Sequence, residues 1–212
     1  FLTVIGLLPF QSSIFSNPAE NPAPCTKFFK LLLQLYNMCF VLRTIFYNAP
    51  ITLREASRIS RCSISKASRI VKDLERKKLI KILVEGRSYL LYPNLENNLL
   101  KFKLLEEEIF YTLKILERYP FLLEKLKNIR GRIVLIFGSY AAEEADELSD
   151  VDILVINGKC NDHFTLSFKE FRRLLKDKNQ TILSVVKKHA IIKGFEDFIE
   201  VMIKWRKGLH GV

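Results

Sequence analysis

Two aspartates two residues apart, Asp150 and Asp152, are the side chains of this 212-residue chain that are best spaced for metal chemistry. They stand in an apolar run that is typical of a β-strand, and residues at i and i+2 of a strand point to the same side. Two carboxylates on one side offer oxygen ligands to a divalent cation. An Asp-x-Asp pair is a weak signal by itself, because such pairs are common in loops.

An earlier apolar run ends in Gly138 and Ser139, where the pattern predicts that a strand is followed by a helix. Unpaired backbone N–H groups at the start of a helix attract phosphate oxygens. Residues 133–156 therefore predict that a metal and a phosphate group meet at one end of two neighbouring strands.

The pattern of Gly138-Ser139, a spacer and Ser-Asp-Val-Asp at 149–152 resembles the nucleotidyltransferase superfamily, which has the DNA polymerase β-like fold. The resemblance is greatest to its minimal nucleotidyltransferase branch, which includes antitoxins. It implies that Asp150 and Asp152 are catalytic and bind Mg²⁺ or Mn²⁺. It implies further that Gly138 and Ser139 bind the phosphates of an NTP, with ATP expected, and that NMP passes to a hydroxyl on a protein partner, which could be toxin-like.

Beyond residue 156 the pattern predicts a helix at 164–175, a strand at 181–186, a short extended piece at 190–192 and a closing helix at 195–205. In the resembling family a third carboxylate on a neighbouring strand binds metal and helps to deprotonate the acceptor. The run at 181–186 contains no acid.

Two function classes therefore stay open: an enzyme with an incomplete catalytic triad, and a non-catalytic transcriptional regulator that keeps the transferase fold. In the first case, an acid from the closing helix or from a partner subunit would complete the site. The candidates on that helix are Glu196, Asp197 and Glu200.

The spacer also departs from the family, which often has a basic residue and a glycine shortly after Gly-Ser. Here the chain has Ala142 and Glu143, followed by Glu144, Asp146 and Glu147. These carboxylates would repel a triphosphate unless metals or Lys side chains intervene. The alternative is that they form a solvated helix face away from the nucleotide.

Two helices joined by a tight turn are predicted between residues 52 and 76. Thr52 and Glu55 have the spacing of a capping box, in which each side chain bonds to the backbone of the other residue. Ser63 can cap the second helix, whose buried stripe is expected to be Ala67, Ile70, Val71 and Leu74. This arrangement is typical of a helix-turn-helix.

A β-hairpin is predicted next, because β-rich runs at 79–84 and 88–92 flank Gly86, which suits a positive φ at a turn. Three helices and a two-stranded wing resemble the winged helix DNA-binding family over residues 38–93, in pattern rather than in any specific motif.

The predicted winged helix is strongly basic. From Arg54 to Arg87 it has 11 Lys or Arg against four Asp or Glu, a net charge of +7, which favours contact with the phosphates of double-stranded DNA. The alternative is a protein-interaction module with a solvated basic face. The residues expected to contact DNA are Ser65, Lys66, Ser68, Arg69, Lys72, Arg76 and Arg87.

The expected fold class is α+β, with a poorly ordered arm or extension at 1–26 and a winged helix-turn-helix domain at 27–94. A helical connector at 95–130 would lead to a nucleotidyltransferase-like α/β sandwich with a small mixed sheet at 131–212. The connector favours a homodimer, because its apolar stripe exceeds what one contact needs. The stripe consists of Leu99, Phe102, Leu105, Ile109, Leu113 and Leu116.

The net charge of +11 and the sequence pI near 9.5 favour an acidic partner, nucleic acid before membrane, because no run approaches the ~20 apolar residues of a membrane span. The four cysteines have no paired spacing, so neither a zinc knuckle nor a disulfide framework is indicated. A cytoplasmic location is expected.

Overall fold

The computed structural model of the chain describes residues 39–158 and 163–210, which lie within one compact unit from Met38 to Val212. The arm expected at 1–26 lies outside the described residues. So do residues 27–38, the start of the range expected for the winged helix-turn-helix domain, and the first described element is α3 (Val41–Asn48).

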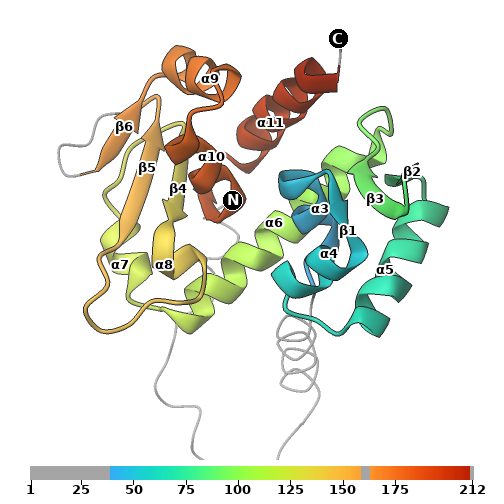
Figure 1. The fold of residues 1–212 in the computed structure, drawn as a ribbon. Helices are drawn as coiled ribbons and strands as arrows, with labels where there is room; N and C mark the ends of the chain where they lie inside the picture. Colours follow the sequence, from blue (N-terminus) through green and yellow to red (C-terminus); the bar gives the residue numbers. More distant parts are fainter. Residues whose placement is uncertain (1–38, 159–162, 211–212) are drawn as a thin grey trace, which may run out of the picture. The chain divides into compact units, whose positions relative to one another are not determined.

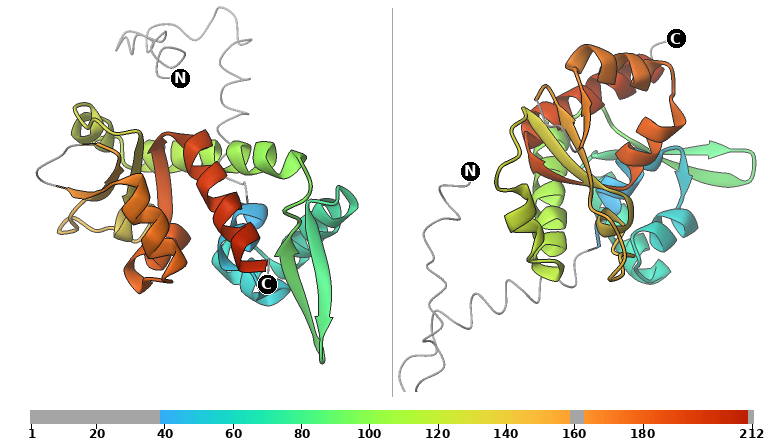
Figure 2. Two further views of the ribbon diagram at one scale, coloured as in Figure 1. Left: turned by 90° about the horizontal axis from the view of Figure 1, so that it is seen from above. Right: turned by 90° about the vertical axis from the view of Figure 1, so that its left-hand side faces the viewer.

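The first part of this unit combines short helices with a three-stranded antiparallel sheet in the order β1-β3-β2 (Figure 1). The hairpin of β2 and β3 projects as a two-stranded ribbon (Figure 2). After α3, the elements are β1 (Ile51–Thr52), α4 (Leu53–Ile59), α5 (Ile64–Arg76), β2 (Ile80–Glu85) and β3 (Ser88–Pro93).

Local sequence signals explain these elements. The Thr52 side chain accepts a bond from the Glu55 backbone at 3.3 Å, and the Glu55 carboxylate accepts one from the Thr52 backbone at 2.8 Å, as the capping box predicts. Ser63 caps α5 through the backbone of Lys66. Gly86 turns the hairpin with a φ of +60°. The buried stripe of α5 is confirmed for Ala67, Val71 and Leu74, with Ile70 partly buried.

The second part of the unit is built on a four-stranded mixed sheet in the order β6-β5-β4-β7. Strands β5 and β6 are parallel, and the other pairs are antiparallel. The small mixed sheet predicted from the sequence is thus present. The elements are α6 (Leu99–Arg118), α7 (Leu122–Leu126), β4 (Ile133–Phe137), α8 (Gly138–Ala141), β5 (Asp152–Ile156), β6 (Phe164–Leu166), α9 (Phe168–Lys176), α10 (Gln180–Lys187), β7 (His189–Lys193) and α11 (Phe195–His210).

Both faces of this sheet are buried. On one face, Leu135 and Leu154 belong to a core that also contains residues of α3, α9, α10 and α11. On the other face, Ile136 and Ile153 belong to a second core that contains residues of α7, α8 and the end of α6. Because both faces are covered, the edges and ends of the strands are the only parts of the described sheet that can meet a ligand.

The strand expected at 181–186 is wrong, because these residues lie in α10. Asn179 caps this helix by accepting a bond from Ile182 N at 3.1 Å. Ile182, Val185 and Val186 then bury one helical face. The strand that pairs with β4 is β7 instead, so the extended piece expected at 190–192 occupies the position expected for 181–186. The helix expected at 164–175 begins later, at Phe168, after the short strand β6.

The apolar stripe expected on the long helix is only partly covered within the described residues. Helix α6 buries Leu100, Leu104, Glu108, Thr112 and Ile115, whereas Leu99 and Phe102 of the expected stripe are 61% and 64% exposed. Two of the buried residues, Glu108 and Thr112, are polar, and both have partners inside the protein. Thr112 donates to the Ile191 carbonyl at 3.0 Å, and Glu108 pairs with Arg43.

Candidate functional site

Gly138 and Asp152 come together where β4 ends and β5 begins. Phe137, the last residue of β4, pairs with Asp152, the first residue of β5. Gly138 has a φ of +71°, and a Cβ placed on it would lie 2.3 Å from Oδ2 of Asp152. Only glycine therefore fits beneath this carboxylate. Asp152 itself is exposed, so its other side faces solvent.

Asp150 lies just before β5 rather than in it. The residue between the two aspartates, Val151, packs against the core on the opposite face from Asp152. The alternation of side chains between the two faces, which is predicted for the strand, thus includes Val151, one residue before β5 begins. The Ser149 hydroxyl donates to Asp146 at 2.7 Å, and the Tyr140 hydroxyl donates to the Ser149 carbonyl at 3.1 Å, which fixes the segment that leads into the pair.

Asp150 and Asp152 are the residues that would hold a divalent metal, since exposed carboxylates supply the oxygen ligands that Mg²⁺ and Mn²⁺ prefer. Within residues 39–158 and 163–210, no three His, Cys, Asp or Glu side chains are grouped to hold a metal ion. A third acid is missing from β7, which reads His-Ala-Ile-Ile-Lys.

The acids of the closing helix are engaged elsewhere. Asp197 forms two bonds to Arg132, at 2.7 and 2.9 Å, and Arg132 precedes β4 at the end opposite Gly138. Glu196 and Glu200 both pair with Lys101 at 2.7 Å. In this unit these three acids do not complete the Asp150–Asp152 pair.

Two of the spacer acids, Glu143 and Glu144, have cationic partners. Glu143, with an 8% exposed side chain, pairs with Lys114 at 2.8 Å and Arg118 at 3.2 Å, both on α6. Glu144 pairs with Arg61 at 3.1 Å. Asp146 accepts bonds from the Ser149 hydroxyl and from Leu148 N, and these bonds lower the pKa of its carboxyl.

A buried polar cluster lies on the β7 side of the same sheet. Arg43 pairs with Glu108 at 3.0 Å and donates to the His189 carbonyl at 2.5 Å. The His189 ring lies 3.5 Å from Glu108, and its Nδ1 bonds to the Val186 carbonyl at 2.8 Å. Since a carbonyl oxygen can only accept, Nδ1 carries the proton.

Burial and the neighbouring charges together set the protonation states of this cluster. Desolvation raises the pKa of the Glu108 carboxyl, but Arg43 and His189 outweigh it, and the pKa falls to about 2. Burial lowers the pKa of His189. Both side chains are completely buried, so neither can receive a proton from an acceptor hydroxyl. Sequence reasoning missed the cluster, and its one signal was a pair of glutamates, Glu107 and Glu108, inside an apolar helix.

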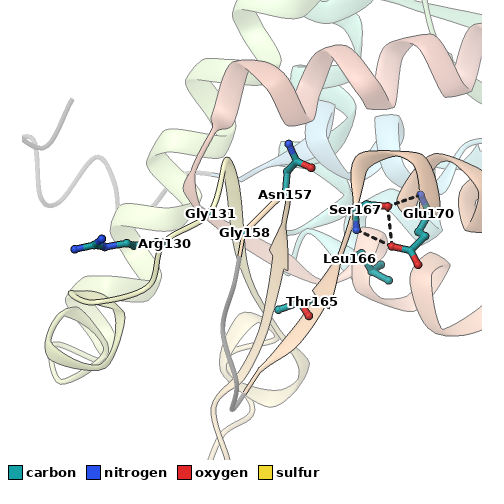
Figure 3. Close-up of a pocket in the computed structure, with 8 residues that line it drawn as sticks. All are labelled: Arg130, Gly131, Asn157, Gly158, Thr165, Leu166, Ser167 and Glu170. Atoms are coloured by element: carbon teal, nitrogen blue, oxygen red, sulfur yellow. Dashed lines mark hydrogen bonds between the residues drawn. The ribbon is translucent and has the colours of Figure 1, made fainter.

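An open cavity of about 800 Å³ lies at the opposite end of β4 and β5 (Figure 3). It is lined by Arg130, Gly131, Asn157, Gly158, Thr165, Leu166, Ser167 and Glu170. The Ser167 and Glu170 side chains bond to each other as the capping box of α9. Because the cavity is separated from Gly138 and Asp152 by the length of the strands, it is not the predicted nucleotide site.

The expected DNA-contacting residues lie on α5 and on the β2–β3 turn. Ser65, Arg69, Lys72 and Arg87 are exposed, whereas Lys66 and Ser68 are half-buried. Arg76 is exposed but pairs with Asp73 on the same helix at 2.5 Å. Their contact with DNA stays a prediction.

A mixed sheet whose inner strand β4 leads into a helix at Gly138, beneath the Asp152 carboxylate, defines an α+β protein with a candidate phosphate and metal site. The family model described as "Nucleotidyltransferase domain" matches residues 120–206. This match supports assignment of that part of the chain to the nucleotidyltransferase superfamily, and it contains Gly138, Ser139, Asp150 and Asp152. Searches of curated proteins and of solved structures gave no match.

In the described part of the chain, no helix is both long enough and apolar enough to cross a membrane.

Proposed function

We propose that the chain is a metal-dependent nucleotidyltransferase that moves NMP from an NTP, with ATP expected, to a hydroxyl on a protein partner. The family match over 120–206 supports the transfer class. The observation that carries the proposal is the Asp152 carboxylate held over Gly138, because it sets an acidic group beside the backbone of the Gly-Ser step.

In this proposal Asp150 and Asp152 hold Mg²⁺ or Mn²⁺, which when bound stabilises charge at the phosphoryl group. Gly138 and Ser139 bind phosphate oxygens of the nucleotide. The absence of a Cβ on Gly138 keeps the backbone open at the point where Asp152 approaches. The chain's own contribution is thus positioning and charge rather than covalent chemistry.

The proposal extends to DNA through the elements from α3 to β3, which we take as a winged helix with α5 as the recognition helix. The order of helices and the β2–β3 hairpin support it, together with the exposed basic side chains of α5. A toxin-like protein is the acceptor we propose, and a homodimer is the proposed assembly.

A second candidate is a regulator that binds DNA and keeps the transferase fold without turnover. The specific observation in its favour is β7, the strand beside β4, which contains no acid where the family has its third carboxylate. General acid-base help is typically worth ~10²- to 10⁴-fold in rate, so its loss would leave a very slow enzyme.

The test compares the wild type with Asp152→Asn, using labelled ATP with Mg²⁺ or Mn²⁺ and candidate protein acceptors, and calorimetry with a non-hydrolysable ATP analogue. We expect wild-type binding and slow transfer, both lost in Asp152→Asn because a metal ligand is removed. Asp177→Asn is the control, since Asp177 is exposed at the end of α9. Binding without transfer would favour the regulator, and no metal-dependent binding would contradict the proposed site.

A further inference from the structure

The turn between α4 and α5 reaches the segment that follows the Gly-Ser step. Arg61, in this turn, donates from Nη2 to the Ala142 carbonyl at 2.9 Å and to Glu144 at 3.1 Å. Ala142 ends the short helix that begins at Gly138, and four helical residues rise only about 6 Å. A change of the Arg61 side-chain rotamer could therefore bring its guanidinium to the proposed phosphate site.

A second cation approaches the same carboxylate from the junction of α10 and β7. The Lys188 ammonium lies 3.7 Å from Glu144. Lys188 directly precedes His189, which pairs with Phe137, the residue before Gly138. Arg61 and Lys188 thus converge from two distant parts of the chain on one acid beside the Gly-Ser step.

The charge balance at Glu144 itself is positive. Glu143 is already paired with Lys114 and Arg118, so Glu144 is left to Arg61 and Lys188. Two cations against one carboxylate leave a positive excess. The Arg61 and Lys188 side chains are 52% and 61% exposed, so a solvent-borne anion can reach both.

Arg61 also holds an unusual backbone conformation for its residue type. Its φ is +51°, a region in which a side chain other than glycine is disfavoured by roughly 1 kcal/mol. The carbonyl of Ala141, next to Ala142 in sequence, accepts a hydrogen bond from the hydroxyl of Tyr111 on α6. The segment after Gly138 is therefore held by α6 as well as by Arg61, so a movement of the Arg61 side chain towards an anion does not release this segment.

We propose that Arg61 and Lys188 bind the triphosphate of the nucleotide and replace the basic residue that the spacer lacks. The inference rests on the proposed function and names the residues that meet its substrate. When the nucleotide binds, its phosphate oxygens take the place of the Glu144 carboxylate on the two cations. Glu144 holds the cations in position when no nucleotide is bound and competes with the phosphates.

This competition gives the test opposite signs for two substitutions. Calorimetry with Mg²⁺ and a non-hydrolysable ATP analogue should show about tenfold weaker binding for Arg61→Gln, because a charge-assisted contact is lost. Glu144→Gln should bind about two- to fivefold more tightly, because a surface ion pair no longer competes. Arg58→Gln, on the exposed side of α4, is the matched control. Adenosine should bind all four proteins equally, since it has no phosphate.

Each other outcome has a distinct meaning. If Arg61→Gln and Glu144→Gln both weaken binding, the pair only positions the segment after Gly138, and the inference is overturned. If the wild type binds the analogue and Arg61→Gln binds it equally well, the inference fails while the proposed function stands. If the wild type shows no binding, the proposed function itself fails. Unchanged thermal unfolding of the variants confirms that folding is not the cause.

Discussion

At the scale of single residues, Gly138 is the glycine of the candidate site at which a side chain is disfavoured by both φ and contact. An alanine there would need a φ of +71° and would bring its Cβ to 2.3 Å from Asp152. The backbone strain alone costs roughly 1–2 kcal/mol.

We therefore predict that Gly138→Ala lowers the free energy of unfolding by about 1–2 kcal/mol and displaces Asp152 enough to abolish analogue binding. Gly208→Ala is the control, because a Cβ at Gly208 in α11 meets no atom within 4 Å. In a helix interior that control should stabilise by up to about 1 kcal/mol. Urea unfolding and calorimetry measure both quantities, and normal binding by Gly138→Ala would contradict the site.

The buried Glu108 gives a prediction for acid stability. Its pKa in the folded protein, about 2, lies below its usual value of 4.5, so the unfolded chain binds this proton more tightly. The stability that Glu108 contributes is therefore complete above about pH 4.5 and is lost as the pH falls from there towards 2.

We expect the free energy of unfolding of the wild type to fall steeply over that interval and that of Glu108→Gln to fall less. At neutral pH the variant should be about 3–5 kcal/mol less stable, because Arg43 is left buried without its counter-charge. Urea titrations at a series of pH values between 3 and 7 test both statements. Parallel curves for the two proteins would show that Glu108 is not ionised in the folded chain.

At the scale of elements, sequence patterns located most helices and strands but misread α10. The run at 181–186 is short and rich in β-branched residues, so its period does not distinguish a strand from a helix. Tertiary packing favours the helix over the strand, since Ile182, Val185 and Val186 all reach the core from one helical face. The capping boxes, by contrast, depend on residues three apart, and that of Thr52 and Glu55 could be predicted from sequence alone.

Helix α5 carries the prediction for DNA binding. Arg69→Ala and Lys72→Ala should each weaken binding to duplex DNA and reduce the slope of log K against log salt by about 0.9, because one phosphate contact is lost. Both side chains are exposed on α5. Lys176→Ala, an exposed change of equal charge in α9, should leave the slope unchanged. Association that does not depend on salt would favour a protein-interaction module.

At the scale of the whole molecule, sequence could predict the residues of one site segment but not what distant segments add to it. Gly138 and Asp152 are separated by a spacer whose pattern is readable, and the structure brings them together. Arg61 lies far from them in sequence, and no local pattern links a residue of the α4–α5 turn to Ala142. The same holds for Arg43, whose partner Glu108 was hidden by an apolar stripe on α6.

The Arg43–Glu108–His189 cluster restricts how a chain of this kind can be assembled by recombination. Its two charged members, Arg43 and Glu108, come from α3 and α6, so a joint between residues 43 and 108 separates charges that are buried together. A transferred gene segment ending inside that interval would bring one buried charge without its partner, at a cost of several kcal/mol. A joint within this interval is therefore expected to destabilise the chain, whereas a joint outside it leaves the Arg43–Glu108 pair intact.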